Sequence, residues 1–154
     1  MTSPLRLCVR RSPALDPGGA ATLVTLRLPS EVGCIEEAVE LVTRHCLAGH
    51  PTAERTRFRL KVVLSEALSN AIVRGNREDR GKWVDIRAEL YPDAIRVYVT
   101  DEGPGFNPSA IPEPIHPEQL DEAGGRGLYL IKKLVDAVQF NEQGNSICMI
   151  LRRP

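Results

Sequence analysis

The sequence has few aromatic residues and no surplus of charge of either sign. Phe, Trp and Tyr make up 5% of its 154 residues, and 20 Lys and Arg balance 20 Asp and Glu. Proteins that bind DNA or RNA usually combine basic patches with aromatic side chains that stack on bases. Direct nucleic-acid binding is therefore not expected, and neither is attraction to an anionic membrane surface.

Long apolar runs and paired cysteines are also absent. No stretch approaches the roughly 18 to 20 apolar residues of a membrane span, and arginines interrupt the N-terminal segment where a signal peptide needs an apolar core. Cys8, Cys34, Cys46 and Cys148 form no CxxC pair and have no zinc-ligand spacing. The sequence predicts a cytoplasmic protein with free thiols and no membrane segment.

Three common phosphate-binding or catalytic motifs can be excluded. The glycines at 75 and 81 are too far apart for a P-loop, and Trp83 follows Lys82 where Ser or Thr is required. The segment 101–106 has two glycines where a dinucleotide fingerprint needs three. No Gly-x-Ser-x-Gly nucleophile elbow occurs in the chain.

The pattern of apolar residues predicts a flexible N-terminal arm at 1–19, rich in Pro and Gly, and one domain at 20–154. Ser30 is expected to cap the first helix. The elements expected in chain order are a strand at 22–28, a helix after Ser30, a helix at 52–75, strands at 82–91 and 95–99, a Pro-rich lid at 107–123, a helix after 127, and strands at 138–141 and 147–151. This order predicts an α/β (α+β) two-layer sandwich, a mixed, mostly antiparallel sheet with helices on one face.

Glu66 and Asn70 lie four residues apart on the predicted helix 52–75, so their side chains leave it on one face. A carboxylate one turn before a carboxamide offers a proton acceptor beside an oxygen ligand for a hard cation. The same pair is also typical of a solvated helix face, and nothing in the helix alone decides between the two interpretations.

Two glycine-containing segments follow. Asp101 ends a predicted strand, and Gly103 and Gly105 leave room for a flat ring beside a carboxylate that can accept a hydrogen bond from an amine; a tight turn is the alternative. The cluster 124–127 places free N–H groups at a helix N-terminus, where Arg126 could add a bond to a phosphate; a hinge is the alternative.

In this order, the three motifs resemble those of the GHKL (Bergerat-fold) ATPases, the superfamily of the histidine kinases. Glu66-x-x-x-Asn70 resembles the N box, Asp101-x-Gly103-x-Gly105 the G1 box, and Gly125-Arg126-Gly127-Leu128 the G2 box. The resemblance covers residues 20–152. Within the superfamily, the sequence is most similar to the small serine kinases that act as anti-sigma factors in bacterial partner switching.

The resemblance implies ATP and Mg²⁺ as cofactors. It implies that Glu66 is the general base, that Asn70 binds Mg²⁺ and that Asp101 binds the adenine amine. The other cofactor-binding residues that it implies are Arg74, Asn76, Gly103, Gly105, Phe106, Gly124, Gly125, Arg126, Gly127, Leu128 and Ser146. Arg74 stands where the family commonly has His, and Ser146 stands near the position of a common Thr.

The implied function is an ATP-dependent protein-serine kinase that acts as an anti-sigma factor and phosphorylates a STAS-type anti-sigma antagonist. The implied partners are therefore a sigma factor and that antagonist, and the implied assembly is a homodimer. Two alternatives stay open: a non-catalytic, ATP-binding sequestering module, and a detached histidine-kinase catalytic domain, which would transfer phosphate to a histidine.

Overall fold

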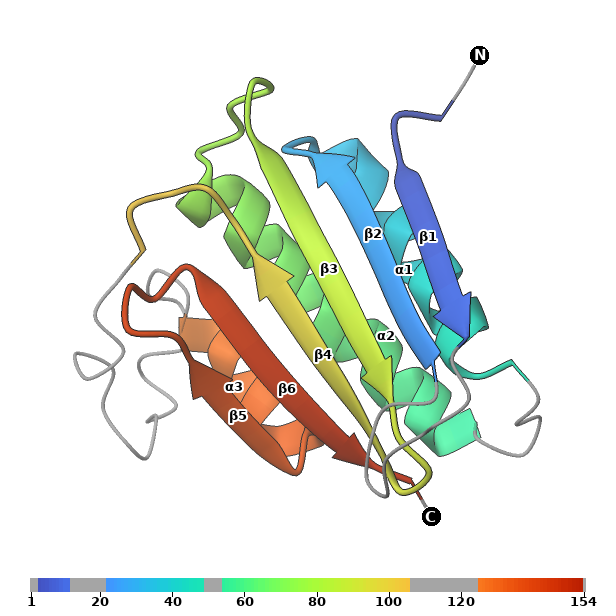
Figure 1. The fold of residues 1–154 in the computed structure, drawn as a ribbon. Helices are drawn as coiled ribbons and strands as arrows, with labels where there is room; N and C mark the ends of the chain where they lie inside the picture. Colours follow the sequence, from blue (N-terminus) through green and yellow to red (C-terminus); the bar gives the residue numbers. More distant parts are fainter. Residues whose placement is uncertain (1–2, 12–21, 49–53, 106–124, 154) are drawn as a thin grey trace.

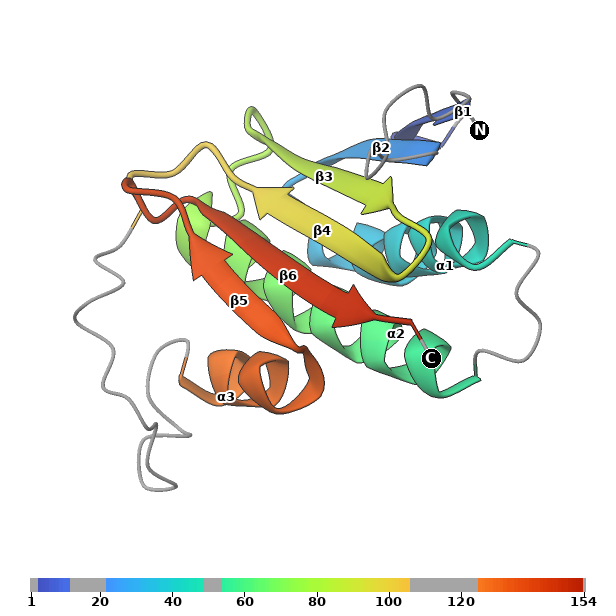
Figure 2. The same ribbon diagram turned by 60° about the horizontal axis from the view of Figure 1, so that its bottom comes forward.

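The protein consists of a six-stranded sheet with three α-helices on one of its faces (Figures 1 and 2). This computed structural model describes residues 3–11, 22–48, 54–105 and 125–153. In Figure 1 the helices lie behind the sheet, and Figure 2 shows the two layers from the side. The predicted two-layer α/β sandwich is confirmed. The predicted lid at 107–123 lies outside the described residues.

The sheet has the order β1-β2-β3-β4-β6-β5. Its strands are β1 (Arg6–Arg11), β2 (Thr22–Pro29), β3 (Trp83–Leu90), β4 (Ala94–Thr100), β5 (Ala137–Phe140) and β6 (Ser146–Arg152). Every pair of neighbouring strands in the described structure is antiparallel. The expectation of a mixed sheet was therefore wrong.

Strand β1 lies within the segment 1–19, for which a flexible arm is predicted, and occupies its residues 6–11. It pairs with β2 along its whole length, from Arg6 opposite Arg27 to Arg11 opposite Thr22. Its inward-facing apolar residues, Leu7 among them, pack against the core. The strand is short and Arg-rich, so its stability comes from pairing with a partner strand that local pattern does not reveal.

The helices are α1 (Ile35–Cys46), α2 (Glu54–Ser69) and α3 (Gly125–Leu134), with a 3₁₀ turn, η1 (Val32–Cys34), before α1 and a π-helical turn, η2 (Asn70–Gly75), after α2. The prediction that Ser30 caps the first helix was wrong, because η1 stands between Ser30 and α1. The Ser30 hydroxyl instead donates to the carbonyl oxygen of Lys82 at 2.8 Å.

The core lies between the sheet and the helices. Helix α2 buries Leu60, Leu64 and Leu68 fully, and these leucines form one cluster with the inward side chains of β3 and β4. This packing fixes the rotation of α2 about its axis, so the direction in which Glu66 and Asn70 leave the helix is also fixed. None of the helices in the described ranges has the length and apolar content needed to cross a membrane.

All four cysteines are free, as predicted. Cys8 is exposed on β1, whereas Cys46 and Cys148 are buried. Burial raises the pKa of the Cys46 thiol to about 12, so this thiol stays protonated at neutral pH. Because the thiolate is the reactive form, Cys46 is an inert core residue.

Candidate functional site

The first half of the site lies where α2 and α3 meet. Gly127, in the first turn of α3, lies directly against Glu66 of α2 and Asn70, the first residue of η2. A Cβ atom on Gly127 would lie 2.9 Å from Glu66 Oε2 and 3.1 Å from Asn70 Nδ2. Any side chain larger than hydrogen at this position would displace these groups. The structure thus brings the Glu66/Asn70 pair together with the predicted glycine cluster.

The second half lies where η2 meets the end of β4. The Cα of Gly75 lies against the Asp101 carboxylate, and a Cβ on Gly75 would collide with that group. A Cβ on Gly103 would in turn collide with the Gly75 carbonyl oxygen. Sequence reasoning assigned Gly75 only to the end of a helix. The structure shows that it also allows η2 to approach the Asp101 loop closely.

Hydrogen bonds hold the Asp101 loop from two directions. The Asp101 N–H donates to the Asn145 carbonyl oxygen at 2.9 Å, and Asn145 Nδ2 donates back to the Asp101 carbonyl oxygen at 3.1 Å. Within the loop, the Gly103 N–H donates to Asp101 Oδ1 at 2.8 Å. Gly105 has φ +79°, a conformation that favours glycine, and it lies against the backbone of Gln143.

Burial raises the pKa of the Asp101 carboxyl above its usual value. The hydrogen bond from the Gly103 N–H and the positive charge of Lys82 lower this pKa and oppose the effect of burial. The Asp101 carboxylate therefore contacts less water than the carboxylate of an exposed aspartate does. A ligand amine that donates to it would replace solvation that the fold has removed.

Asn76, which the resemblance implies to be a cofactor-binding residue, has internal partners in the structure. Its side chain is buried, with 1% of the residue exposed. Its Nδ2 donates to Ser30 Oγ at 2.8 Å and to the Trp83 carbonyl oxygen at 3.0 Å, and its Oδ1 accepts from the Glu102 N–H at 2.8 Å. All three of these hydrogen bonds join the carboxamide to other residues of the protein. We therefore assign Asn76 as a positioning residue for the Asp101 loop.

Replacing Asn76 with Ala should lower the free energy of unfolding by about 2–4 kcal/mol, because the Glu102 N–H and the Trp83 carbonyl lose their partner. It should also weaken ATP binding, since the Asp101 loop loses the hydrogen bond from the Glu102 N–H to Asn76. Urea unfolding and calorimetry, at a temperature where both proteins are folded, measure the two effects.

The control for Asn76→Ala is Val42→Ala, which removes buried methyl groups from α1 and no contact of the loop. Both variants should be less stable than the parent protein, but only Asn76→Ala should bind ATP more weakly. Equal ATP affinity in all three folded proteins would show that Asn76 has no positioning role.

The other predicted site residues have varied surroundings. Ser146 shares a 2.7 Å hydrogen bond with Thr100 Oγ1, and Leu128 is buried with 4% exposed. Arg74 is exposed at the end of η2, and Arg126 is exposed in the first turn of α3. Gly125 begins α3, so its N–H is among those without a partner inside the helix. Phe106 and Gly124 lie outside the described residues.

The donor set suits a magnesium–nucleotide complex better than a free metal ion. Among the described residues no group of three or more His, Cys, Asp or Glu side chains could hold a metal. Asn70 offers one amide oxygen beside Gly127, at the N-terminal turn of α3. Mg²⁺ usually takes one or two protein ligands and completes its shell with phosphate and water, so the residues present fit this cofactor pair.

Comparison with known proteins agrees with this geometry. The sequence profile of the Histidine kinase-like ATPase domain matches residues 28–151, which include every element from the end of β2 into β6. The chain belongs to this family. The resemblance stated from the three motifs is therefore confirmed.

Relatives of this ATPase domain include proteins named Serine-protein kinase RsbW. The protein of Bacillus subtilis (strain 168) is 36% identical over 98 residues, which cover 58% of this chain and 61% of that protein. That of Oceanobacillus iheyensis is 34% identical over 97 residues, with 59% and 61% covered. That of Listeria innocua serovar 6a is 30% identical over 139 residues, with 82% and 84% covered. The match thus spans about three fifths of the first two relatives.

Proposed function

We propose that this chain is an ATP-dependent protein-serine kinase that acts as an anti-sigma factor in a partner-switching pathway. The observation that carries the proposal is the position of Gly127, which lies directly against Glu66 and Asn70. This contact joins a carboxylate, an oxygen ligand for a cation and a helix N-terminus in one place, as phosphoryl transfer requires. The name of the relatives, Serine-protein kinase RsbW, supports the choice of serine as acceptor.

Each residue has a distinct role in the proposed reaction. Asp101 accepts a hydrogen bond from the adenine amine, and the N–H groups at the start of α3, with Arg126, stabilise phosphate charge. Asn70 is the protein ligand of Mg²⁺, which neutralises the charge of the phosphates when it is bound. Glu66 accepts the proton of the attacking serine hydroxyl and orients this hydroxyl. Catalysis is then mainly positioning and electrostatic stabilisation.

The partners are part of the proposal. The acceptor serine belongs to a STAS-type anti-sigma antagonist, and the protein that is sequestered is a sigma factor. We further propose that residues 20–154, together with β1, form the functional unit, and that this unit works as a homodimer. A purified chain whose mass by light scattering is that of a monomer would contradict the last point.

Calorimetry on the parent protein and on Asn70→Ala tests the nucleotide site first. We expect the parent to bind ATP only weakly without Mg²⁺ and more tightly with it. Asn70→Ala should lose the effect of Mg²⁺, because the amide oxygen is the protein's ligand for the metal. Gln139→Ala is the matched control, since it removes an exposed carboxamide from β5. Equal Mg²⁺ dependence in all three proteins would refute the assignment.

The transfer reaction is tested with STAS-domain proteins of the same genome, each purified and incubated with γ-labelled ATP and the parent protein. Acid-stable phosphoserine on one of them is the expected result. Complex formation without a labelled protein would favour the sequestering module. Arg74, which stands where the family commonly has His, is one argument for this alternative. Acid-labile phosphate on a histidine would favour the detached histidine-kinase domain.

A further inference from the structure

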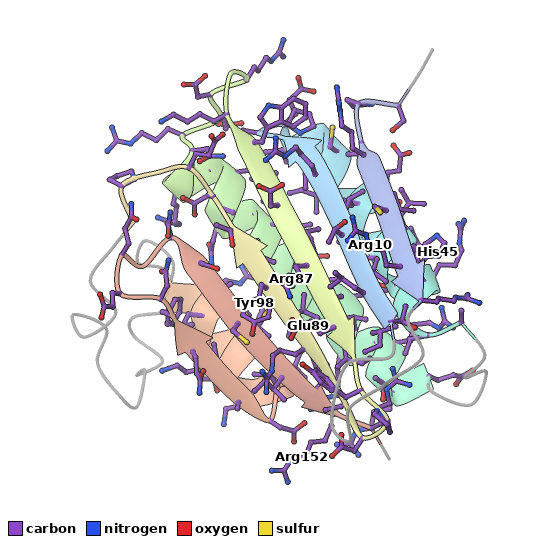
Figure 3. All side chains as sticks on the ribbon, viewed as in Figure 1. Arg10, His45, Arg87, Glu89, Tyr98 and Arg152 are labelled. Carbon is purple, nitrogen blue, oxygen red and sulfur yellow. The ribbon has the colours of Figure 1, made fainter. Side chains whose placement is uncertain are left out.

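The face of the sheet opposite the helices is uncovered in the described structure, and arginines are prominent on it (Figure 3). Figure 3 is viewed toward this face, with Arg10, Arg87, Glu89 and Tyr98 labelled. The side chains of β1–β4 that alternate with the core residues point to it. We call this surface the arginine face, and its arginines are Arg6, Arg10, Arg27, Arg87 and Arg96.

The arginine face has a surplus of positive charge, although the chain as a whole is neutral. Asp85 and Glu89 are its carboxylates on β1–β4. Glu102, which follows β4, accepts from the Trp83 N–H and also acts on Arg27, so five arginines against three carboxylates leave two positive charges. Arg27 Nε lies 2.8 Å from Asp85 Oδ1, and Arg87 lies 2.8 Å from Glu89 Oε2. Asp85 and Glu89 are thus already paired, and the surplus is available to a partner.

The composition of this face is that of a protein interface. None of the six described strands contains a lysine, so every cation on them is an arginine. The guanidinium groups of Arg6 and Arg27 lie 5.9 and 5.8 Å from the ring centre of Trp83, and that of Arg96 lies 5.6 Å from the ring centre of Tyr91. Arginine and aromatic residues are enriched in interfaces, where lysine is depleted.

Stacking and ion pairing also order four of these arginines, Arg6, Arg27, Arg87 and Arg96, before any partner arrives. A side chain that is already ordered loses less entropy on binding than a free one, so these contacts favour affinity. The stacked arrangement thus presents these guanidinium groups to a partner in a fixed position.

We propose that the arginine face binds an acidic surface of a partner protein. A second copy of the chain is a poor occupant, because a two-fold axis through this face would set arginines against arginines. Nucleic acid is disfavoured because guanidinium groups lie over the rings of Trp83 and Tyr91, on which bases would otherwise stack.

The arginine face and the nucleotide site lie on opposite sides of the sheet. Glu66, Asn70 and Gly127 belong to the helix layer, which covers one face of the sheet (Figure 2). The arginines alternate with the core residues of β1–β4 and therefore point to the other face. The two surfaces can therefore be occupied at the same time. The proposal goes beyond the kinase function, because it stands or fails whether or not the chain transfers phosphate.

Trp83 provides a local readout for this surface, since it is the one tryptophan in the chain and lies beneath two of the arginines. Its fluorescence is followed while a glutamate-rich peptide without tryptophan is added to the full chain at low salt. We expect saturable binding that weakens steeply with salt. In Arg6→Glu/Arg10→Glu, affinity for the peptide should fall at least about tenfold.

The matched control is Arg44→Glu/Arg55→Glu, which makes the same change in net charge at exposed positions of α1 and α2. It should bind the peptide as the parent does. Arg6→Gln/Arg10→Gln, with a smaller expected loss, replaces the Glu pair if thermal unfolding shows that pair to be misfolded. Equal losses in test and control variants, or no binding at all, overturn the proposal.

Three further results would identify another occupant and so overturn the proposal. One is tighter binding of a single-stranded DNA oligonucleotide than of the peptide, with the same loss in Arg6→Glu/Arg10→Glu. The second is tighter binding of vesicles that contain phosphatidylglycerol. The third is a parent dimer that the Arg6→Glu/Arg10→Glu exchange dissociates, as measured by light scattering, because the face would then join two copies.

Discussion

Replacing Glu66 with Gln should lower the rate of phosphoryl transfer by about 10²- to 10⁴-fold while leaving ATP affinity unchanged. Gln keeps the size of Glu and can still lie beside Gly127, but it cannot accept a proton at neutral pH. The binding contacts assigned to Asp101, Asn70 and α3 are not altered. Single-turnover transfer to the antagonist measures the rate, and calorimetry measures the affinity for ATP with Mg²⁺.

Glu54→Gln is the control for this prediction, because it makes the same exchange at the exposed start of α2. It should transfer phosphate at the parent rate. If Glu66→Gln also transfers at the parent rate, Glu66 is not the base. If Glu66→Gln loses ATP binding, the residue holds the nucleotide site together and its catalytic role has to be measured by other substitutions.

Replacing Asp101 with Asn should weaken ATP binding by at least about 100-fold, because a carboxylate acceptor for the adenine amine is replaced by a group that can present an N–H donor. The fold should survive, since the amide oxygen can still accept from the Gly103 N–H that now lies 2.8 Å from Oδ1. Calorimetry with ATP measures the loss. Unchanged affinity would contradict the assignment of Asp101 to the adenine.

Asp101→Asn should not lower the free energy of unfolding at neutral pH. The direction of this effect follows from the raised pKa of Asp101. Burial raises the pKa of Asp101 in the folded chain above its unfolded value, so ionised Asp101 destabilises the fold at pH 7. A neutral Asn removes this cost. The stability advantage of Asp101→Asn should therefore be present at pH 7 and shrink as pH falls through the folded pKa towards the ordinary value near 3.8. Urea unfolding at several pH values measures it.

Local pattern predicted most of the secondary structure, because these elements bury one face. Val84, Ile86 and Ala88 alternate on β3 and are all buried, as alternation predicts. Strand β1 was missed because its partner, β2, is what makes it a strand. Ser30 was assigned to the wrong contact for a similar reason: its partner Lys82 is far away in sequence and lies nearby only once the sheet has formed.

The parts of the candidate site that could be predicted are those whose residues lie close together in the sequence. Glu66 and Asn70 share one helix, so their common direction follows from a four-residue spacing. The contacts of Asn76 could not be predicted, because its partners, Ser30, Trp83 and Glu102, come from three other segments. The close approach of Gly75 to Asp101 was missed as well, since no spacing rule relates a π-helical turn to a strand end.

The order of strands in the sheet has a consequence for how the protein folds. The β3–β4 and β5–β6 pairs join neighbours in sequence, whereas β2–β3 joins residues 22–29 to 83–90 and β4–β6 joins 94–100 to 146–152. Closing such long loops is slow, so we expect these pairings to form late. The segments that carry the nucleotide site, α2, η2, the end of β4 and α3, are also far apart in sequence, so we expect ATP to bind the folded chain. At a hundred times its dissociation constant, ATP would add about 2.7 kcal/mol to the stability of the folded chain by mass action.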